Sequence, residues 1–276
     1  MNKIIWYNLL EYGYIEIYGK EYNSFLQSQL TCDIRKIKKN ECIISSHCNR
    51  KGRIISLFWI HKIDNSVRLI MPNDVIDIAL EHLKKYSFFS KIYFRIKKFS
   101  YLGIKIKKNY VFPSSFFKKK IVKIFENKYL YCISKNEKIN FEELSSINIW
   151  EQYFIKKYHF FLFPETIGKL LPNNTNLEKL KGLSFNKGCF IGQEIIARTH
   201  FLGKNTKKLI LLHSSGKPKI LENIKNEKNQ DCGKIIFFSK KLNKKQFCLA
   251  IIKNVSYQEN KILTTEISKH TVIIKK

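Results

Sequence analysis

The sequence predicts an α+β fold that is followed by a small antiparallel β-barrel, and three observations lead to this prediction. Strand patterns and helical stripes of apolar residues alternate along the chain as far as Gly203. Beyond Gly203, strand patterns separated by polar turns follow one another without a convincing helix. This change of pattern divides the chain into an α+β region over residues 1–203 and a C-terminal β-barrel over residues 204–276.

The elements of the α+β region follow from the spacing of their apolar residues. Alternating residues predict strands over 14–18, 42–47, 53–63, 67–71, 91–97, 101–106, 120–125 and 129–134. Helical spacing predicts helices over 20–31, 75–86, 141–157 and 193–200. The second of these helices follows Asn73 and Asp74, which we expect to cap it. Residues 158–180 contain Pro164 and Pro172 and are expected to be irregular.

The barrel is predicted from alternating patterns alone. Its strands are expected over 207–213, 233–238, 247–253, 261–267 and 270–275. With 44% apolar and 14% aromatic residues among 276, the chain has enough apolar material for a substantial core, which excludes disorder as its main description.

The sequence contains no pattern that is typical of a membrane or export segment. Its longest strongly apolar stretch, Ile54–Ile60, is far too short to span a bilayer. The N-terminal residues carry Asn8 and Glu11 within their apolar run, and no small-residue cleavage site follows. We therefore expect a cytoplasmic protein without a membrane partner.

The formal net charge of +29 has two interpretations that the sequence leaves open. The excess is nearly all lysine, whereas dedicated nucleic-acid readers rely on arginine for bidentate contacts. Lysine, asparagine, isoleucine and phenylalanine are enriched together, which is the pattern expected of an AT-rich genome. The charge is either a product of this composition or a source of attraction to RNA or another polyanion.

The seven cysteines favour neither disulfides nor a metal site. Their number is odd, their spacings are wide and no CxxC occurs, and no second ligand pair completes a four-coordinate site. Most of these thiols are expected to be small buried hydrophobes, and no metal cofactor is expected. Cys189 is the exception, because of the segment in which it lies.

Residues 181–203 are the segment least explained by the overall composition of the chain. Gly188 and Gly192 allow tight turns or close approach of a ligand. A helix is expected to begin just after Gly192, which places Cys189 at or just before its N-terminus and beside Lys187. The free backbone N–H groups of the helix and the lysine would both favour the thiolate.

Spacing alone leaves a second interpretation of this segment open. Glu194 and Arg198 are four residues apart, a spacing at which they could pair on one face of the helix. The segment can then be a buried cysteine in a glycine-rich turn next to a surface ion pair, without any chemical role.

The stretch KGCFIGQEIIAR at 187–198 strongly resembles the K-G-C-[FY]-x-G-Q-E-x-x-A-R signature of the YgfZ-type proteins, a folate-binding, tRNA-modification-linked family of the aminomethyltransferase (GcvT)-like superfamily. Further stretches resemble the family in the same order, at 25–33, 47–53, 83–92 and 171–185, so that the resemblance covers roughly residues 10–205. The signature positions of this chain are Lys187, Gly188, Cys189, Gly192, Gln193, Glu194 and Arg198.

The resemblance implies two interleaved α+β subdomains in a ring-like arrangement, a C-terminal antiparallel barrel, and a pocket for tetrahydrofolate or a related reduced folate. Two family tryptophans flank the folate; one corresponds to Trp150, and the other falls on Tyr12. A flat pterin prefers aromatic faces, and an anionic glutamate tail prefers cations such as Lys187 and Arg198. Asn49 is a second departure, because the family generally carries Asp there.

The function implied by the resemblance is that of a folate-binding accessory protein. Such a protein supports tRNA modification and the synthesis or repair of iron–sulfur enzymes, including those that thiolate tRNA, with Cys189 as the candidate reactive thiol. Whether the chain is itself an enzyme is left open, as is direct contact with tRNA.

Two other functions are kept as alternatives. A folate-dependent aminomethyltransferase or demethylase is less favoured, because the chain lacks the G-Y-T-G-E element of the glycine-cleavage branch. A non-enzymatic RNA-binding module is suggested by the charge alone, since no RNP, KH or helix-turn-helix signature occurs.

Overall fold

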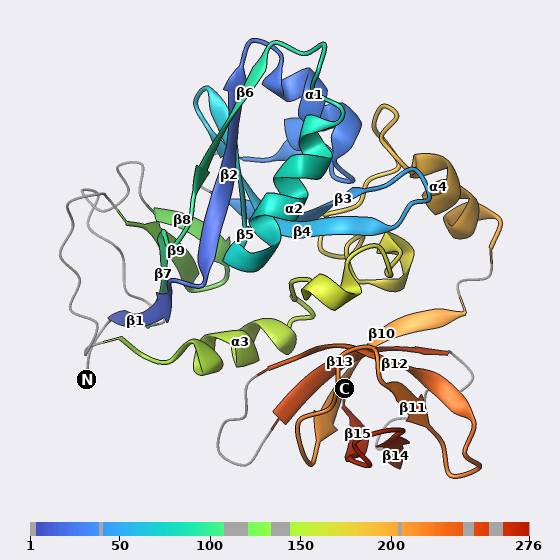
Figure 1. The fold of residues 1–276 in the computed structure, drawn as a ribbon. Helices are drawn as coiled ribbons and strands as arrows, with labels where there is room; N and C mark the ends of the chain where they lie inside the picture. Colours follow the sequence, from blue (N-terminus) through green and yellow to red (C-terminus); the bar gives the residue numbers. More distant parts are fainter. Residues whose placement is uncertain are drawn as a thin grey trace. The chain divides into compact units, whose positions relative to one another are not determined.

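The computed structural model describes residues 4–38, 41–107, 121–133, 144–203, 206–239, 246–253 and 262–275. The chain forms two compact units (Figure 1). Unit 1 comprises 1–47, 57–147 and 181–190, and unit 2 comprises 48–56, 148–180 and 191–276. Each unit thus combines segments that are distant in sequence.

The larger sheet of unit 1 has five strands in the order β3-β4-β5-β2-β6. These strands are β2 (Tyr12–Gly19), β3 (Cys42–Cys48), β4 (Ile54–Ile63), β5 (Ser66–Pro72) and β6 (Ile92–Lys97). Helix α1 (Tyr22–Gln29) follows β2, and α2 (Asn73–Lys84) packs against β2 and β5 through its buried apolar stripe. All of these elements were expected from the sequence.

Glu16 is a buried carboxylate near the middle of this sheet. It lies directly opposite Arg68 on β5 and Arg95 on β6. Its oxygens accept a hydrogen bond from Ser66 at 2.8 Å and lie 3.6 Å from Arg68 and 3.9 Å from Arg95. A buried carboxylate needs such partners, so two of the six arginines serve the sheet.

A second sheet of unit 1 has the order β1-β7-β9-β8. Its strands are β1 (Ile4–Leu9), β7 (Tyr101–Ile106), β8 (Ile121–Phe125) and β9 (Lys128–Cys132). Strand β1 was not expected, and it forms because it pairs along its whole length with β7, about one hundred residues away. Ser145 joins its other edge, with backbone bonds to Trp6 at 2.8 Å and from Asn8 at 3.1 Å.

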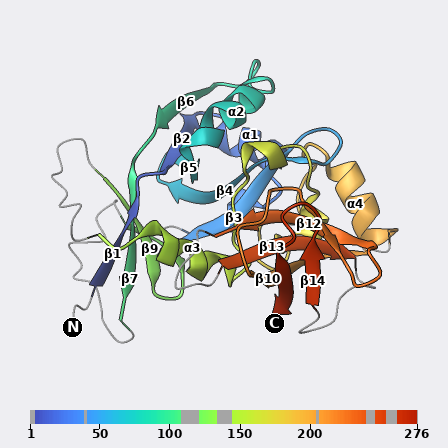
Figure 2. The same cartoon turned by 60° about the horizontal axis from the view of Figure 1, so that its bottom comes forward.

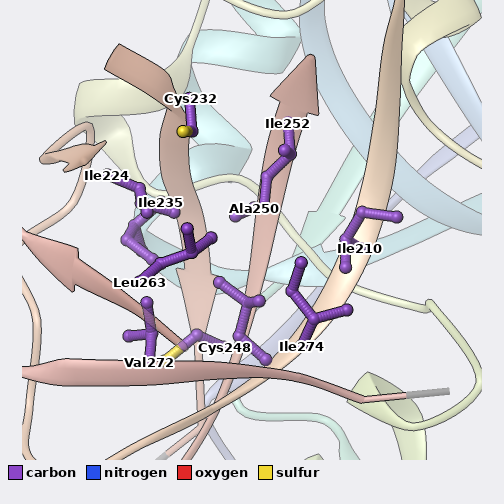
Figure 3. Packing of buried hydrophobic residues seen from close by; sticks show 11 residues of the cluster. Ile210, Ile224, Cys232, Ile235, Cys248, Ala250, Ile252, Leu263, Val272 and Ile274 are labelled. Carbon is purple, nitrogen blue, oxygen red and sulfur yellow. The ribbon is translucent and has the colours of Figure 1, made fainter. Parts of the chain in front are cut away.

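Unit 2 contains the closed antiparallel barrel, with the strand order β10-β13-β12-β11-β14-β15. The strands are β10 (Lys207–Ser214), β11 (Asn223–Lys225), β12 (Asp231–Phe238), β13 (Gln246–Lys253), β14 (Ile262–Thr265) and β15 (Thr271–Lys275). Aliphatic side chains and two cysteines fill its interior (Figure 3). The barrel prediction is confirmed; β11 was missed, because three residues are too short to show an alternating pattern.

The remaining helices differ in detail from the expectations. α3 (Ile147–Ile155) is shorter than the predicted 141–157; of that range, 141–143 lie outside the described residues, and Ser145 pairs with β1. α2 begins at Asn73 itself, with Pro72 as the N-cap, so the predicted cap was wrong. α4 (Gln193–Phe201) begins after Gly192, as expected. Among the described residues, none of the helices is long and apolar enough to cross a membrane.

The burial of His47 on β3 predicts that the folded protein loses stability as the pH falls. Its ring is fully buried beside His82, at a centroid distance of 4.7 Å, and neither ring nitrogen has a hydrogen-bond partner among the described residues. Burial, with a smaller contribution from His82, lowers the pKa of His47 to about 3.

The unfolded chain takes up a proton at His47 near pH 6.5, whereas the folded chain does not until about pH 3. Stability from the neutral ring is therefore present above pH 6.5 and is lost as the pH falls below it, by up to about 1.4 kcal/mol per pH unit. His47→Phe should flatten the pH dependence of urea unfolding between pH 6.5 and 4.5. An unchanged slope would contradict this account.

Candidate functional site

A cavity of about 350 Å³ lies in unit 1 where two chain segments and Phe99, between β6 and β7, meet. One segment is the turn between β1 and β2, directly before Tyr12, and the other leads into α3, which carries Trp150. The size falls at the lower end of the range of small-molecule sites. The cavity is lined by Asn8, Leu10, Glu11, Phe99, Leu144, Ser145, Ser146 and Ile147.

Asn73 and Gly13 hold one wall of this cavity. The Asn73 side chain donates to the Leu10 carbonyl at 2.8 Å, and its oxygen accepts from the Phe99 backbone N–H at 3.2 Å. A Cβ on Gly13 would collide with the Lys97 carbonyl and with the Asn73 side chain, so only glycine allows this close approach. The residue that we expected to cap α2 therefore shapes the cavity instead.

Phe99 is held in an unusual conformation at this wall. Its φ is 52°, in the left-handed region that bulky residues rarely adopt, and its side chain is 64% exposed. Such strain, held in place by a defined hydrogen bond, is often found at ligand sites. An exposed ring at a cavity is suited to the face of a flat ligand.

Glu11 adds a carboxylate to the same cavity. A carboxylate accepts paired hydrogen bonds from the donor edge of a planar heterocycle. The aliphatic lining residues can pack against the apolar parts of such a ligand. Sequence reasoning missed both Glu11 and Phe99, because neither lies in a motif and a positive φ at a phenylalanine leaves no signal in the sequence.

The two predicted folate-flanking aromatics lie in different units. Tyr12, in unit 1, is nearly buried and stacks on Trp59 at a centroid distance of 5.8 Å and an interplanar angle of 22°. Trp150, in unit 2, is fully buried and packs 5.0 Å from the Phe154 ring. The sandwich of a pterin between Tyr12 and Trp150 stays a prediction.

Lys187 anchors the first part of the signature within unit 1. Its ammonium donates to the backbone carbonyls of Gln27, Leu30 and Cys32 at 2.6, 2.7 and 2.8 Å. Carbonyls at the end of a helix lack intrahelical partners and carry partial negative charge, so a cation at the end of α1 satisfies them. Burial lowers the pKa of this ammonium to about 8.

Hydrogen bonds to Thr31 reinforce this attachment. Its hydroxyl donates to the Gly182 carbonyl at 2.6 Å, and its own carbonyl accepts from the Ser184 backbone N–H at 2.9 Å. The segment 181–190 is therefore joined to the end of α1 at two places.

Cys189 follows two residues after Lys187 and is exposed. All seven cysteines lie in described segments, and five of the others are buried, as the sequence analysis expected of most of them. Burial raises the pKa of Cys32 to about 11 and that of Cys248 to about 12, so these remain thiols. Because α4 begins at Gln193, Cys189 precedes the N-cap Gly192 by three residues, and thiolate formation at Cys189 stays a prediction.

The second part of the signature is built into unit 2 through two glycines. Gly192 has a φ of 80° and Gly52 a φ of 69°, and their backbones lie against each other. A Cβ on Gly192 would lie 2.5 Å from the Asn49 carbonyl oxygen and 2.7 Å from the Gly52 Cα. The start of α4 is thereby packed directly on the turn at residues 49–53.

Asn49 organises this turn. Its side-chain oxygen accepts backbone hydrogen bonds from Lys51 and Arg53, both at 3.0 Å. A neutral amide oxygen therefore does what an aspartate would do at this position, and the departure from the family pattern leaves the turn intact.

Helix α4 exposes Glu194 and Arg198 to solvent, and no ion pair joins them among the residues that the structure describes. The helix is held instead by Asn173, which donates to the Ile196 carbonyl at 3.0 Å, and by His200, 3.6 Å from Glu178. Gln193 forms the first turn of the helix. The pairing that the spacing allows is absent because both side chains reach into water, where such a pair gains little.

The two signature glycines provide a matched test of this geometry. Gly192→Ala places a Cβ in a left-handed conformation against neighbouring backbone, so we expect unfolding free energy to fall by about 2–4 kcal/mol. Gly188→Ala meets no atom within 4 Å and should change stability by no more than about 0.5 kcal/mol. Urea denaturation measures both variants, and equal stabilities would refute the proposed role of Gly192.

Comparisons with known proteins agree with the resemblance seen in the signature. No family model matches the chain. It is 29% identical to the "tRNA-modifying protein YgfZ" of Buchnera aphidicola subsp. Baizongia pistaciae, over 92% of this chain and 89% of that protein. It is 27% identical to the protein of the same name from Colwellia psychrerythraea, over 75% of this chain and 70% of that protein.

A solved structure shows the same fold. The glycine cleavage system aminomethyltransferase T from Bartonella henselae aligns with a TM-score of 0.76 and 10% sequence identity, over 99% of this chain and 85% of that one. An identity this low bears on the fold alone. The chain thus has a GcvT-like fold with a closed antiparallel barrel, and its resemblance to the YgfZ-type tRNA-modifying proteins, first seen in the signature, is confirmed.

Proposed function

We propose that this protein binds a reduced folate and acts as an accessory factor in tRNA modification. The similarity to YgfZ-type proteins over most of the chain carries the proposal, and the GcvT-like fold is compatible with it. Tetrahydrofolate or a related reduced folate is the proposed cofactor, and an accessory role is favoured over that of a classical enzyme.

The unit 1 cavity supports the folate part of the proposal. Glu11 offers a carboxylate for the amino-pyrimidine edge of a pterin, and Phe99 offers an aromatic face. Tyr12, directly after Glu11, and Trp150 are the further aromatic contacts implied by the resemblance. Arg198, which is exposed in unit 2, stays the candidate that the sequence offers for the anionic glutamate tail, independently of this cavity.

The proposed mechanism uses Cys189 as the reactive thiol. Its exposure permits contact with a client protein, whereas five of the other cysteines are buried. The clients proposed from the resemblance are iron–sulfur enzymes, including those that thiolate tRNA. In this role the thiol acts as a nucleophile or as a redox-sensitive group that protects a cluster of the client.

Calorimetric titration with tetrahydrofolate tests the folate site. We expect Glu11→Gln to weaken binding about tenfold, because a hydrogen bond to a charged acceptor is worth about 1.5–3 kcal/mol. Phe99→Ala should weaken it about fivefold through lost stacking. The control is Phe89→Ala, which removes a 95% exposed ring outside the cavity and should leave affinity unchanged.

The outcomes of this titration distinguish an error in the proposed folate site from an error in the proposed function. If the unaltered protein binds tetrahydrofolate but all three variants bind it equally well, the folate lies elsewhere. If the unaltered protein does not bind any reduced folate, the proposed function itself is wrong.

Cys189→Ala tests the thiol. In a strain that lacks its own YgfZ-type protein, we expect this variant to fold normally but to fail to restore tRNA thiolation, measured by mass spectrometry of tRNA nucleosides. Cys132→Ala, which removes a half-buried thiol, is the control and should restore it. Full activity of Cys189→Ala would remove the thiol from the mechanism.

A further inference from the structure

Unit 2 contains a cavity of about 560 Å³ that the proposed function does not use. Its walls include residues of β10, β12 and β13, Leu221 and Asn223 near the start of β11, the irregular segment around residues 169–174, and Arg53 of the turn at 49–53. Strands β10, β13 and β12 lie side by side in the barrel (Figure 2). The cationic lining residues are Arg53, Lys169, Lys207, Lys234 and Lys253.

The barrel ladder brings like charges together at this cavity. Lys207 on β10 lies directly opposite Lys253 on β13, and Lys234 on β12 lies opposite Ile251, two residues from Lys253. Like charges directly opposite each other destabilise a sheet, and diagonal neighbours remain within reach of long side chains. Packing of the barrel does not require this arrangement, whereas an anionic ligand would be stabilised by it.

The acidic lining residue among those that the structure describes is Asp231, and its charge is already matched. Lys225, which does not line the cavity, lies 3.1 Å from Asp231 and also 3.1 Å from Glu266. Asp231 therefore offsets little of the positive potential inside the cavity.

Arg53 is fixed at the rim of the cavity. One guanidinium nitrogen donates to the Lys169 carbonyl at 3.1 Å, while the Asn49 turn holds its backbone. Arginine presents five donors in a rigid fork that matches phosphate oxygens, and this is one of only six arginines in a lysine-rich chain. Its placement here is not explained by a general enrichment in lysine.

We propose that this cavity binds consecutive phosphate groups of an RNA backbone. Five cations exceed what one phosphate neutralises, and the volume is in the range of sites for larger ligands. The lining residues that the structure describes include no aromatic ring, so bases have no stacking platform and recognition falls on the phosphates. The choice of RNA over free polyphosphate rests on the proposed role in tRNA modification.

The test compares two charge-matched triple variants in unit 2. The cavity variant is Lys169→Gln/Lys234→Gln/Lys253→Gln, and the control is Lys179→Gln/Lys219→Gln/Lys228→Gln, whose three lysines are exposed outside the cavity. Binding of a fluorescein-labelled tRNA transcript is measured by anisotropy from 50 to 200 mM salt. Thermal unfolding checks that both variants remain folded.

We expect the cavity variant to bind tRNA at least about tenfold more weakly at 50 mM salt. The slope of log affinity against log salt should become shallower by about 2, since each lost phosphate contact removes roughly 0.7–0.9 from it. The control should change the slope by less than about 1. Equal weakening by both variants would show general attraction to a basic surface and would overturn the proposal.

Inorganic tripolyphosphate distinguishes the source of the phosphates. We expect tripolyphosphate to displace tRNA from the unaltered protein. The tripolyphosphate concentration needed for this should be well above the tRNA concentration that half-saturates the protein. If tripolyphosphate binds the cavity while tRNA affinity is the same in all proteins, the RNA assignment is wrong. Tetrahydrofolate titration of the cavity variant should match the unaltered protein, so the failure of folate binding and the failure of RNA binding remain distinguishable.

Discussion

The placement of the signature depends on the half-buried ammonium of Lys187 and its hydrogen bonds. Its three protons satisfy three carbonyls around the end of α1, and no uncharged side chain of similar length could do this. The desolvation of the ammonium opposes the arrangement, and the three short hydrogen bonds offset it. Cys189 is itself exposed, but the chain is fixed by Lys187 only two residues before it.

The signature thus contains residues that the fold requires and exposed residues that are available for chemistry. Lys187 and Gly192 are required by contacts that the fold makes, one with carbonyls and the other with a neighbouring backbone. Cys189, Glu194 and Arg198 are exposed, and no side-chain hydrogen bond or ion pair with a described residue of their own unit explains why those residue types are needed. The signature pattern by itself does not distinguish these two groups of residues. The contacts do: one group holds the segment in place, and the other is exposed to a ligand or client protein.

The arginines of the chain also fall into two groups, those that stabilise the fold and one that lies at a cavity. Arg68 and Arg95 flank Glu16 within the sheet of unit 1, so part of the scarce arginine serves stability. Arg53 instead joins several lysines at one cavity of unit 2, where the ladder register brings positive charges together. A high number of lysines does not by itself explain this local arrangement.

Sequence alone determined most of the strands and helices, though not β1 or β11, and it determined the barrel after Gly203, the start of α4 and the burial of most cysteines, because each of these depends on local periodicity or on residue type. Tertiary structure decided the rest. Strand β1 exists through its pairing with β7, and the Asn73 side chain holds two residues that line a cavity, Leu10 and Phe99, rather than capping a helix. Glu11 and Phe99 face that cavity together because segments distant in sequence meet there, and such long-range proximity leaves no trace in local spacing.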